Sequence, residues 1–243
     1  MTSGKYLYGI VEGSSEVRLK DTGLFGNHAY AVPYKDLSAV VSNVPLKEMQ
    51  PDAEAITSHQ RVIEESRMCG TILPARFGIM FKSDDGVKQM LTKSYKELKT
   101  KMNKVRGKDE FGLKILIEES DLKKFALSSH NNAEVKKIKK EISSSGEGTA
   151  YFLKMRMEEA IRNDTYRRID LLSHKIHAEL AKSVVDSCIL KSDFDQIILN
   201  AAYLIDRGEA QDFHKKFEAI KSRHAKEGFT FHLSGPWAPY SFC

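Results

Sequence analysis

The strongest restriction on the fold of this 243-residue chain comes from the order of strand-like and helix-like segments after Gly107. A short strand pattern at Leu113–Ile117 precedes a helical pattern that begins near Thr149 and continues for roughly thirty residues. Two strand patterns, a helix pattern and a last strand pattern at Phe229–Leu233 follow. This order, strand, helix, strand, strand, helix, strand, is that of a ferredoxin-like (βαββαβ) domain. The lysine-rich segment at about 120–148 then forms a helical insert in its first crossover.

The residues before Gly107 contain a separate set of elements. Strands are predicted at Lys5–Val11, His28–Val32, Leu37–Val44 and Thr71–Phe81, and helices are predicted from Pro51 to Gly70 and from Asp84 to Arg106. We therefore predict an α+β protein with two domains. Residues 1–107 form a small mixed α+β domain, and residues 108–243 form the ferredoxin-like domain, which ends in an extended aromatic tail at 234–243.

Composition and signatures exclude several classes of function. Lysine and arginine total 38 against 33 acidic residues, so overall charge does not indicate nucleic acid, and no apolar run reaches the roughly 20 residues of a membrane span. Three cysteines without C-x-x-C spacing favour a reducing, cytoplasmic location. Phosphate-binding, dinucleotide-binding, zinc-protease and hydrolase signatures are absent. We therefore expect no enzyme, no catalytic residues, no cofactor and no metal.

Two features leave alternatives open. Asp170, His174 and His177 have a spacing that stacks three metal-ligand types on one helix face, although histidines flanking a buried stripe are the favoured interpretation. Residues 82–142 contain 16 basic against 10 acidic residues, which permits an RNA-binding surface but favours a solvated face, because base-stacking aromatics are sparse there.

The candidate partner-binding residues are Arg76, Phe77, Trp237, Tyr240 and Phe242. Arg76 stands inside the apolar segment Leu73–Phe81, where a covered arginine requires a polar partner. Phe77 follows Arg76 in the same segment, and Trp237, Tyr240 and Phe242 lie in the tail, whose two prolines prevent it from forming an inner strand. The tail rings either pack on their own domain or form an exposed aromatic patch for a partner.

Four segments carry a family resemblance that spans nearly the whole chain. They are Tyr6–Val11, His59 followed by Leu73–Phe81, Ala150–Leu153, and Gly235–Phe242. In this order and spacing they resemble the gas vesicle protein F/L family, GvpF and GvpL. The chain departs from the family pattern at Ala238, where a second proline is usual. The resemblance supplies no catalytic residue.

The resemblance implies an accessory or minor structural protein of gas vesicle assembly, located in the cytoplasm and at the gas vesicle. Its expected partners are the small hydrophobic shell protein GvpA, or the growing shell, and other gas vesicle accessory proteins. Such a shell subunit would aggregate in water unless another protein shielded its apolar surface. The alternatives are a ferredoxin-like regulator that senses a small ligand, or an RNA-binding module that uses residues 82–142.

Overall fold

The computed structural model describes the chain except at a few positions, and its contacts divide the chain into two compact units. The described residues are 3–13, 23–47, 49–127, 132–192, 194 and 196–243. The first unit consists of Met1–Phe111, Leu204–Arg207 and Gly235–Cys243, and the second of Gly112–Tyr203 and Gly208–Ser234. The sequence predicts residues 234–243 in the second domain, whereas their contacts place Gly235–Cys243 in the first unit. The tail therefore packs on elements that begin more than a hundred residues earlier.

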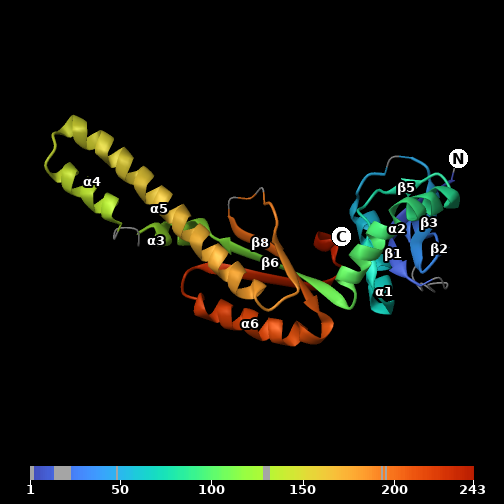
Figure 1. Ribbon diagram of the computed structural model, residues 1–243. Coiled ribbons are helices and arrows are strands. Elements are labelled where there is room, and N and C mark those ends of the chain that lie inside the picture. The colour runs from blue at the N-terminus through green and yellow to red at the C-terminus, as the bar shows by residue number, and fades with distance from the viewer. Residues whose placement is uncertain (1–2, 14–22, 48, 128–131, 193, 195) are drawn as a thin grey trace. The chain divides into compact units, whose positions relative to one another are not determined.

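The first unit is built on an antiparallel sheet (Figure 1). Its elements are β1 (Ser3–Glu12), the 3₁₀ turn η1 (Leu24–Gly26), β2 (Ala29–Tyr34), β3 (Leu37–Pro45), α1 (Ala53–Cys69), β4 (Ile72–Pro74), β5 (Met80–Phe81), α2 (Asp84–Val105) and, in the tail, η4 (Tyr240–Phe242). The strand order is β2-β3-β1-β4, and β5 also pairs with β1. Both helices begin at predicted positions, because the side chains of Asp52 and Ser83 accept hydrogen bonds from the first turns of α1 and α2.

A β-bulge in β1 determines which side chains face each helix. The pairing of β1 with β3 shifts between Leu7 and Gly9, so Tyr6 and Tyr8 face α1 while Leu7 and Ile10 face α2. Gly9 is required here, since an added Cβ would lie 2.7 Å from the Leu73 carbonyl oxygen. The sheet is thus covered on both faces, and its strands are apolar on both sides.

The predicted strand at Thr71–Phe81 is wrong as a single element. It divides into β4 and β5, with a turn between them that we call the edge turn, Arg76–Ile79. Pro74 has no N–H to donate to a ladder, and Gly78 has a φ of +93°, which suits a turn and not a strand. Ala75 N–H still donates to the Tyr8 carbonyl, and Leu7 N–H donates to the Ile79 carbonyl, so the edge turn stays against β1.

The second unit contains most of a second sheet and the long helix. The elements of this part of the chain are β6 (Lys108–Ile117), α3 (Glu119–Leu127), α4 (Ala133–Ser143), α5 (Glu147–Ala181), β7 (Asp186–Ile189), β8 (Ile197–Asp206), η3 (Arg207–Glu209), α6 (Ala210–Arg223) and β9 (Phe229–Trp237). The strand order is β7-β8-β6-β9, and the ends of β6, β8 and β9 belong to the first unit. The described chain is therefore an α+β protein with two antiparallel sheets and six α-helices.

The long helical pattern from about Thr149 is confirmed by α5. The expected insert at 120–148 contains α3 and α4, although its residues 128–131 lie outside the described part of the chain. Val135 and Ile138 of α4 are buried, and α4 packs along α5 as a helical hairpin (Figure 1). Helix α3 was not predicted, because its sequence is charged and none of its residues is buried.

Candidate functional site

Three of the four segments that carry the family resemblance meet in the first unit, in a cluster of aromatic rings. The ring cluster consists of Tyr6 and Tyr8 from β1, His59 from α1 and Phe77 from the edge turn. The ring centroids of Tyr6 lie 5.0 Å from Tyr8, 5.5 Å from His59 and 5.8 Å from Phe77, with edge-on geometry. Tyr240 of the tail packs against the same core. These segments are thus held together by a common core.

His59 is the polar centre of the ring cluster and is almost fully buried. Its Nδ1 lies 2.9 Å from the Tyr6 hydroxyl, and its Nε2 lies 3.2 Å from the Ala75 carbonyl oxygen. A carbonyl can only accept, so Nε2 carries the proton and Nδ1 accepts from Tyr6. Burial lowers the pKa of His59 to about 4. The imidazole is therefore neutral at physiological pH and connects β1 to the segment before the edge turn.

Two apolar hollows open on either side of the edge turn. One, of about 370 Å³, is lined on the α2 side of the sheet by Leu7, Ile10, Leu73, Ile79, Met90, Leu98 and neighbouring residues. The other, of about 300 Å³, is lined by Pro51, Ile56, His59, Gln60, Phe77 and Tyr240. Tyr240 lines both hollows, and Ile79 is 38% exposed at the first. This arrangement presents apolar surface that another apolar group could fill.

The tail is attached to the first unit by a buried carboxylate. Glu110 accepts hydrogen bonds from Ser241 N–H and from the Ser241 hydroxyl, each at 2.7 Å. Burial raises the pKa of Glu110, and the two Ser241 hydrogen bonds oppose that rise. Gly235 approaches closely as well, since its φ is +118° and an added Cβ would lie 2.8 Å from the Glu110 carbonyl oxygen.

The five candidate partner-binding residues occupy different environments. Arg76 is exposed in the edge turn and, within the described ranges, forms no ion pair, so the polar partner that a covered arginine would require is not needed. Phe77 and Tyr240 are half-buried and line one hollow together. Trp237 is 43% exposed. Phe242 is buried, with Lys104 Nζ 5.5 Å from its ring centre, so a partner could reach that ring only by displacing the tail.

The sequence by itself indicates no role for His59 or Glu110. Glu110 follows Lys108 and Asp109, so its neighbours in the chain give no sign that it is buried, and His59 was visible only as part of the family pattern. Their partners lie far along the chain: Tyr6 is 53 residues from His59, and Ser241 is 131 residues from Glu110. Only the tertiary contacts identify them.

Replacing Tyr240 with phenylalanine is expected to stabilise the first unit by about 1 kcal/mol. The Tyr240 hydroxyl is buried and has no hydrogen-bond partner among the described residues, so removing it abolishes a desolvation cost. Tyr6→Phe is the matched comparison and is expected to destabilise by about 1–2 kcal/mol, because the Tyr6 hydroxyl bonds both His59 and Gly78 N–H. Urea unfolding followed by fluorescence of Trp237, the only tryptophan, measures both. Equal effects of the two variants would contradict this account.

The residues of the two alternative sites, the metal site and the RNA-binding surface, have contacts within the chain. His177 Nδ1 lies 3.0 Å from the Tyr203 hydroxyl, while His174 lies 3.4 Å from Asp170, so the two histidines have different partners. Across the described ranges, no three His, Cys, Asp or Glu side chains gather as a metal site would require. In the basic segment, Lys99 pairs with Asp36 at 2.7 Å. Among the described helices, none has the length and apolarity to cross a membrane.

By its fold the chain is an α+β protein with two antiparallel sheets, and its candidate site is a pair of apolar hollows flanking a turn at a sheet edge. Comparison with known proteins identifies the family. Residues 4–243 match the family described as gas vesicle synthesis protein GvpL/GvpF. The chain belongs to this family and is therefore involved in gas vesicle formation.

Individual relatives match over most of their length. Gas vesicle protein F of Haloferax mediterranei is 26% identical over 246 residues, which cover 100% of this chain and 94% of that protein. Gas vesicle protein L of a Streptomyces species is 25% identical over 219 residues, covering 87% and 77% of the two chains. The crystal structure of GvpF from Anabaena has the same fold, with a TM-score of 0.85 at 21% identity over 99% of this chain and 98% of that one.

Proposed function

We propose that this protein assists gas vesicle assembly by binding the hydrophobic shell protein GvpA, or the growing shell, through the edge turn and its two apolar hollows. The observation that carries the proposal is the pair of hollows around Tyr240, which lie beside the exposed side chains of Arg76 and Ile79. The free energy of an apolar subunit in water falls when its apolar side chains are covered. The protein would act by non-covalent binding, without catalysing a reaction, in the cytoplasm and at the vesicle.

The edge turn suits this role because it interrupts the sheet edge. Strands β4 and β5 contribute only three and two residues, and the segment between them leaves the ladder at Arg76–Gly78. An apolar side chain of a partner can therefore approach the hollows beside the edge turn without meeting a continuous edge strand. Arg76 and Lys101 line the larger hollow and add positive charge to its margin.

We further propose that the second sheet and its two helical connections form a ferredoxin-like domain with α3 and α4 as an insert. The strand order β7-β8-β6-β9 and the connection of β6 to β7 through α5, and of β8 to β9 through α6, support this description. In this proposal the domain is a scaffold, and shell binding belongs to the first unit.

Ile79→Glu is expected to reduce capture of GvpA by the tagged, full-length protein about tenfold or more. The side chain is 38% exposed, so the variant should fold, but a bound apolar partner would bury the new carboxylate without a counter-charge. The measurement is co-purification of GvpA from cells that produce both proteins. Leu171→Glu is the matched control, because Leu171 is 62% exposed and lies on α5 in the second unit.

Two outcomes would contradict the proposed function. One is that the unchanged protein captures no more GvpA than an unrelated tagged protein does. The other is that Ile79→Glu and Leu171→Glu reduce capture equally, since the effect would then have no relation to the hollows. Circular dichroism of each purified variant checks that its fold is retained.

A further inference from the structure

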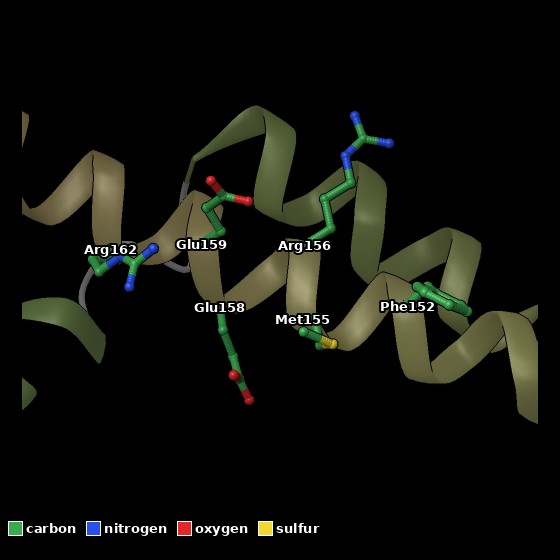
Figure 2. A pocket seen from close by; sticks show the side chains of 6 residues that line it. All are labelled: Phe152, Met155, Arg156, Glu158, Glu159 and Arg162. Atoms are coloured by element: carbon green, nitrogen blue, oxygen red, sulfur yellow. The ribbon is translucent and has the colours of Figure 1, made fainter.

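Helix α5 carries an exposed stripe of side chains that no described element of its own unit covers. The stripe, as we define it, consists of Phe152, Met155, Glu159, Arg162 and Tyr166. Phe152 is 72% exposed, Met155 53% and Tyr166 50%, and the two charged residues between them are exposed as well. Figure 2 looks onto this surface, with Arg156 and Glu158 pointing away to opposite sides of it. Three large apolar side chains on one exposed helix face are a feature of interaction surfaces.

The spacing along the stripe is that of one continuous helix face. Successive members are separated by three, four, three and four residues, which places them in a single row along the axis. The face of α5 that packs on α4 is a different one, where Asp164 and Thr165 are buried. The stripe is therefore a separate face of α5 from the one that packs on α4.

The charged and apolar side chains of the stripe would match those of a second copy of the stripe that runs antiparallel to it. When two copies of α5 cross with a two-fold axis between Ala160 and Ile161, Met155 of each copy lies opposite Tyr166 of the other. Glu159 of each copy then lies opposite Arg162 of the other. One register thus produces two ion pairs and two sulfur–aromatic contacts, with no like charges opposed along the row.

The same register provides a place for Phe152. It sets Phe152 of one copy opposite Ile169 of the other. Ile169 lines a hollow of about 480 Å³ together with Tyr166, Phe194 and Ile197, all within the second unit, and Asp170 and Ser192 line its polar part. An aromatic ring that is 72% exposed in one copy would be covered there in the other. The projecting ring and the hollow lie at symmetry-related positions, as an isologous interface requires.

We infer that the stripe is a self-association surface on which a second copy of this chain binds antiparallel to the first. The occupant is a second copy because both the charge pattern and the ring-and-hollow arrangement are self-complementary about one axis. A purely apolar partner would instead bury Glu159 and Arg162 without opposite charges. The inference concerns a different unit from the proposed shell-binding surface, so each can fail independently.

Charge reversal on the stripe tests the inference in the full-length protein. Sedimentation equilibrium is expected to show a monomer–dimer equilibrium for the unchanged protein. Glu159→Arg and Arg162→Glu each replace two attractive contacts by two repulsive ones, so each should weaken dimerisation about tenfold or more. Mixing the two variants should restore association. One copy then carries arginine at both positions and the other carries glutamate at both, so opposite charges face each other throughout the mixed pair.

Controls separate this surface from others. Lys154→Glu reverses an exposed charge on a different face of α5 and should leave the dimer unchanged. Phe152→Ala should weaken it, because the hollow would lose its ring. The inference is overturned if the unchanged protein remains monomeric at every concentration reached, even if the stripe variants lose GvpA. It is overturned equally if the mixture of charge-reversed variants associates no more strongly than either variant alone.

Discussion

Asp109→Asn is expected to lower the free energy of unfolding of the first unit by about 3–5 kcal/mol. Asp109 is buried and its Oδ1 accepts from Arg67 at 2.9 Å and from Arg207 at 3.2 Å. Arg67 is itself buried, with Glu64 as its second partner. An amide in place of the carboxylate would leave that largely buried guanidinium with Glu64 as its remaining carboxylate partner.

The measurement is urea unfolding followed by the fluorescence of Trp237, which lies in the same unit as the ion network. Asp206→Asn provides the comparison, because Asp206 is a half-exposed partner of Lys108 at 3.7 Å and should cost less than about 1 kcal/mol. A loss for Asp109→Asn no larger than that for Asp206→Asn would show that the buried network contributes little to stability.

Acidification from pH 6.5 to pH 4 is expected to remove about 3 kcal/mol of stability through His59 alone. Its folded pKa of about 4 lies below the ordinary value of 6.5 because burial disfavours the imidazolium. Between these pH values the unfolded chain binds more protons at this position than the folded chain does. The contribution is therefore fully present above pH 6.5 and is lost as the pH falls to about 4.

His59→Gln isolates this contribution. The variant should be less stable at pH 7, by about 1–2 kcal/mol, because Gln cannot maintain both hydrogen bonds of the ring. Its stability should then fall less steeply with acid than that of the unchanged protein. His174→Gln, at an exposed position on α5, is the control for replacing a histidine outside the ring cluster. If both proteins lost stability in parallel between pH 6.5 and 4, His59 would not be the group responsible.

Elements with a long and regular apolar period could be predicted from sequence. Helix α2 follows from one apolar face with a polar face opposite and begins at the expected cap, Ser83, whereas α5 follows from apolar residues that keep helical spacing over a long segment. The segment Thr71–Phe81 could not be assigned correctly by the same reasoning. Its apolar content fits a buried strand, but Pro74 and Gly78 divide it, and what remains is two short strands and a turn. The composition of this segment indicates that it is buried but not whether it forms a strand or a turn.

Only part of the candidate site could be predicted from the sequence, for a related reason. The sequence names Phe77 and Tyr240 as candidate partner-binding residues, and the structure brings both to one hollow. Phe242, from the same tail, is buried, because η4 turns its ring inward while Ser241 binds Glu110. Neighbouring aromatics in an irregular segment have no period from which to read their direction.

By itself the sequence determined the family, the number and type of most elements, and the apolar character of the edge-turn region. These properties depend on residues close together in the chain, where spacing and side-chain type suffice. The tertiary structure alone decided that the tail packs on the first unit, that His59 is neutral between Tyr6 and Ala75, and that the stripe on α5 stays exposed. Each of these properties depends on which distant residues of the chain come into contact. No local sequence pattern indicates the free energy of such contacts.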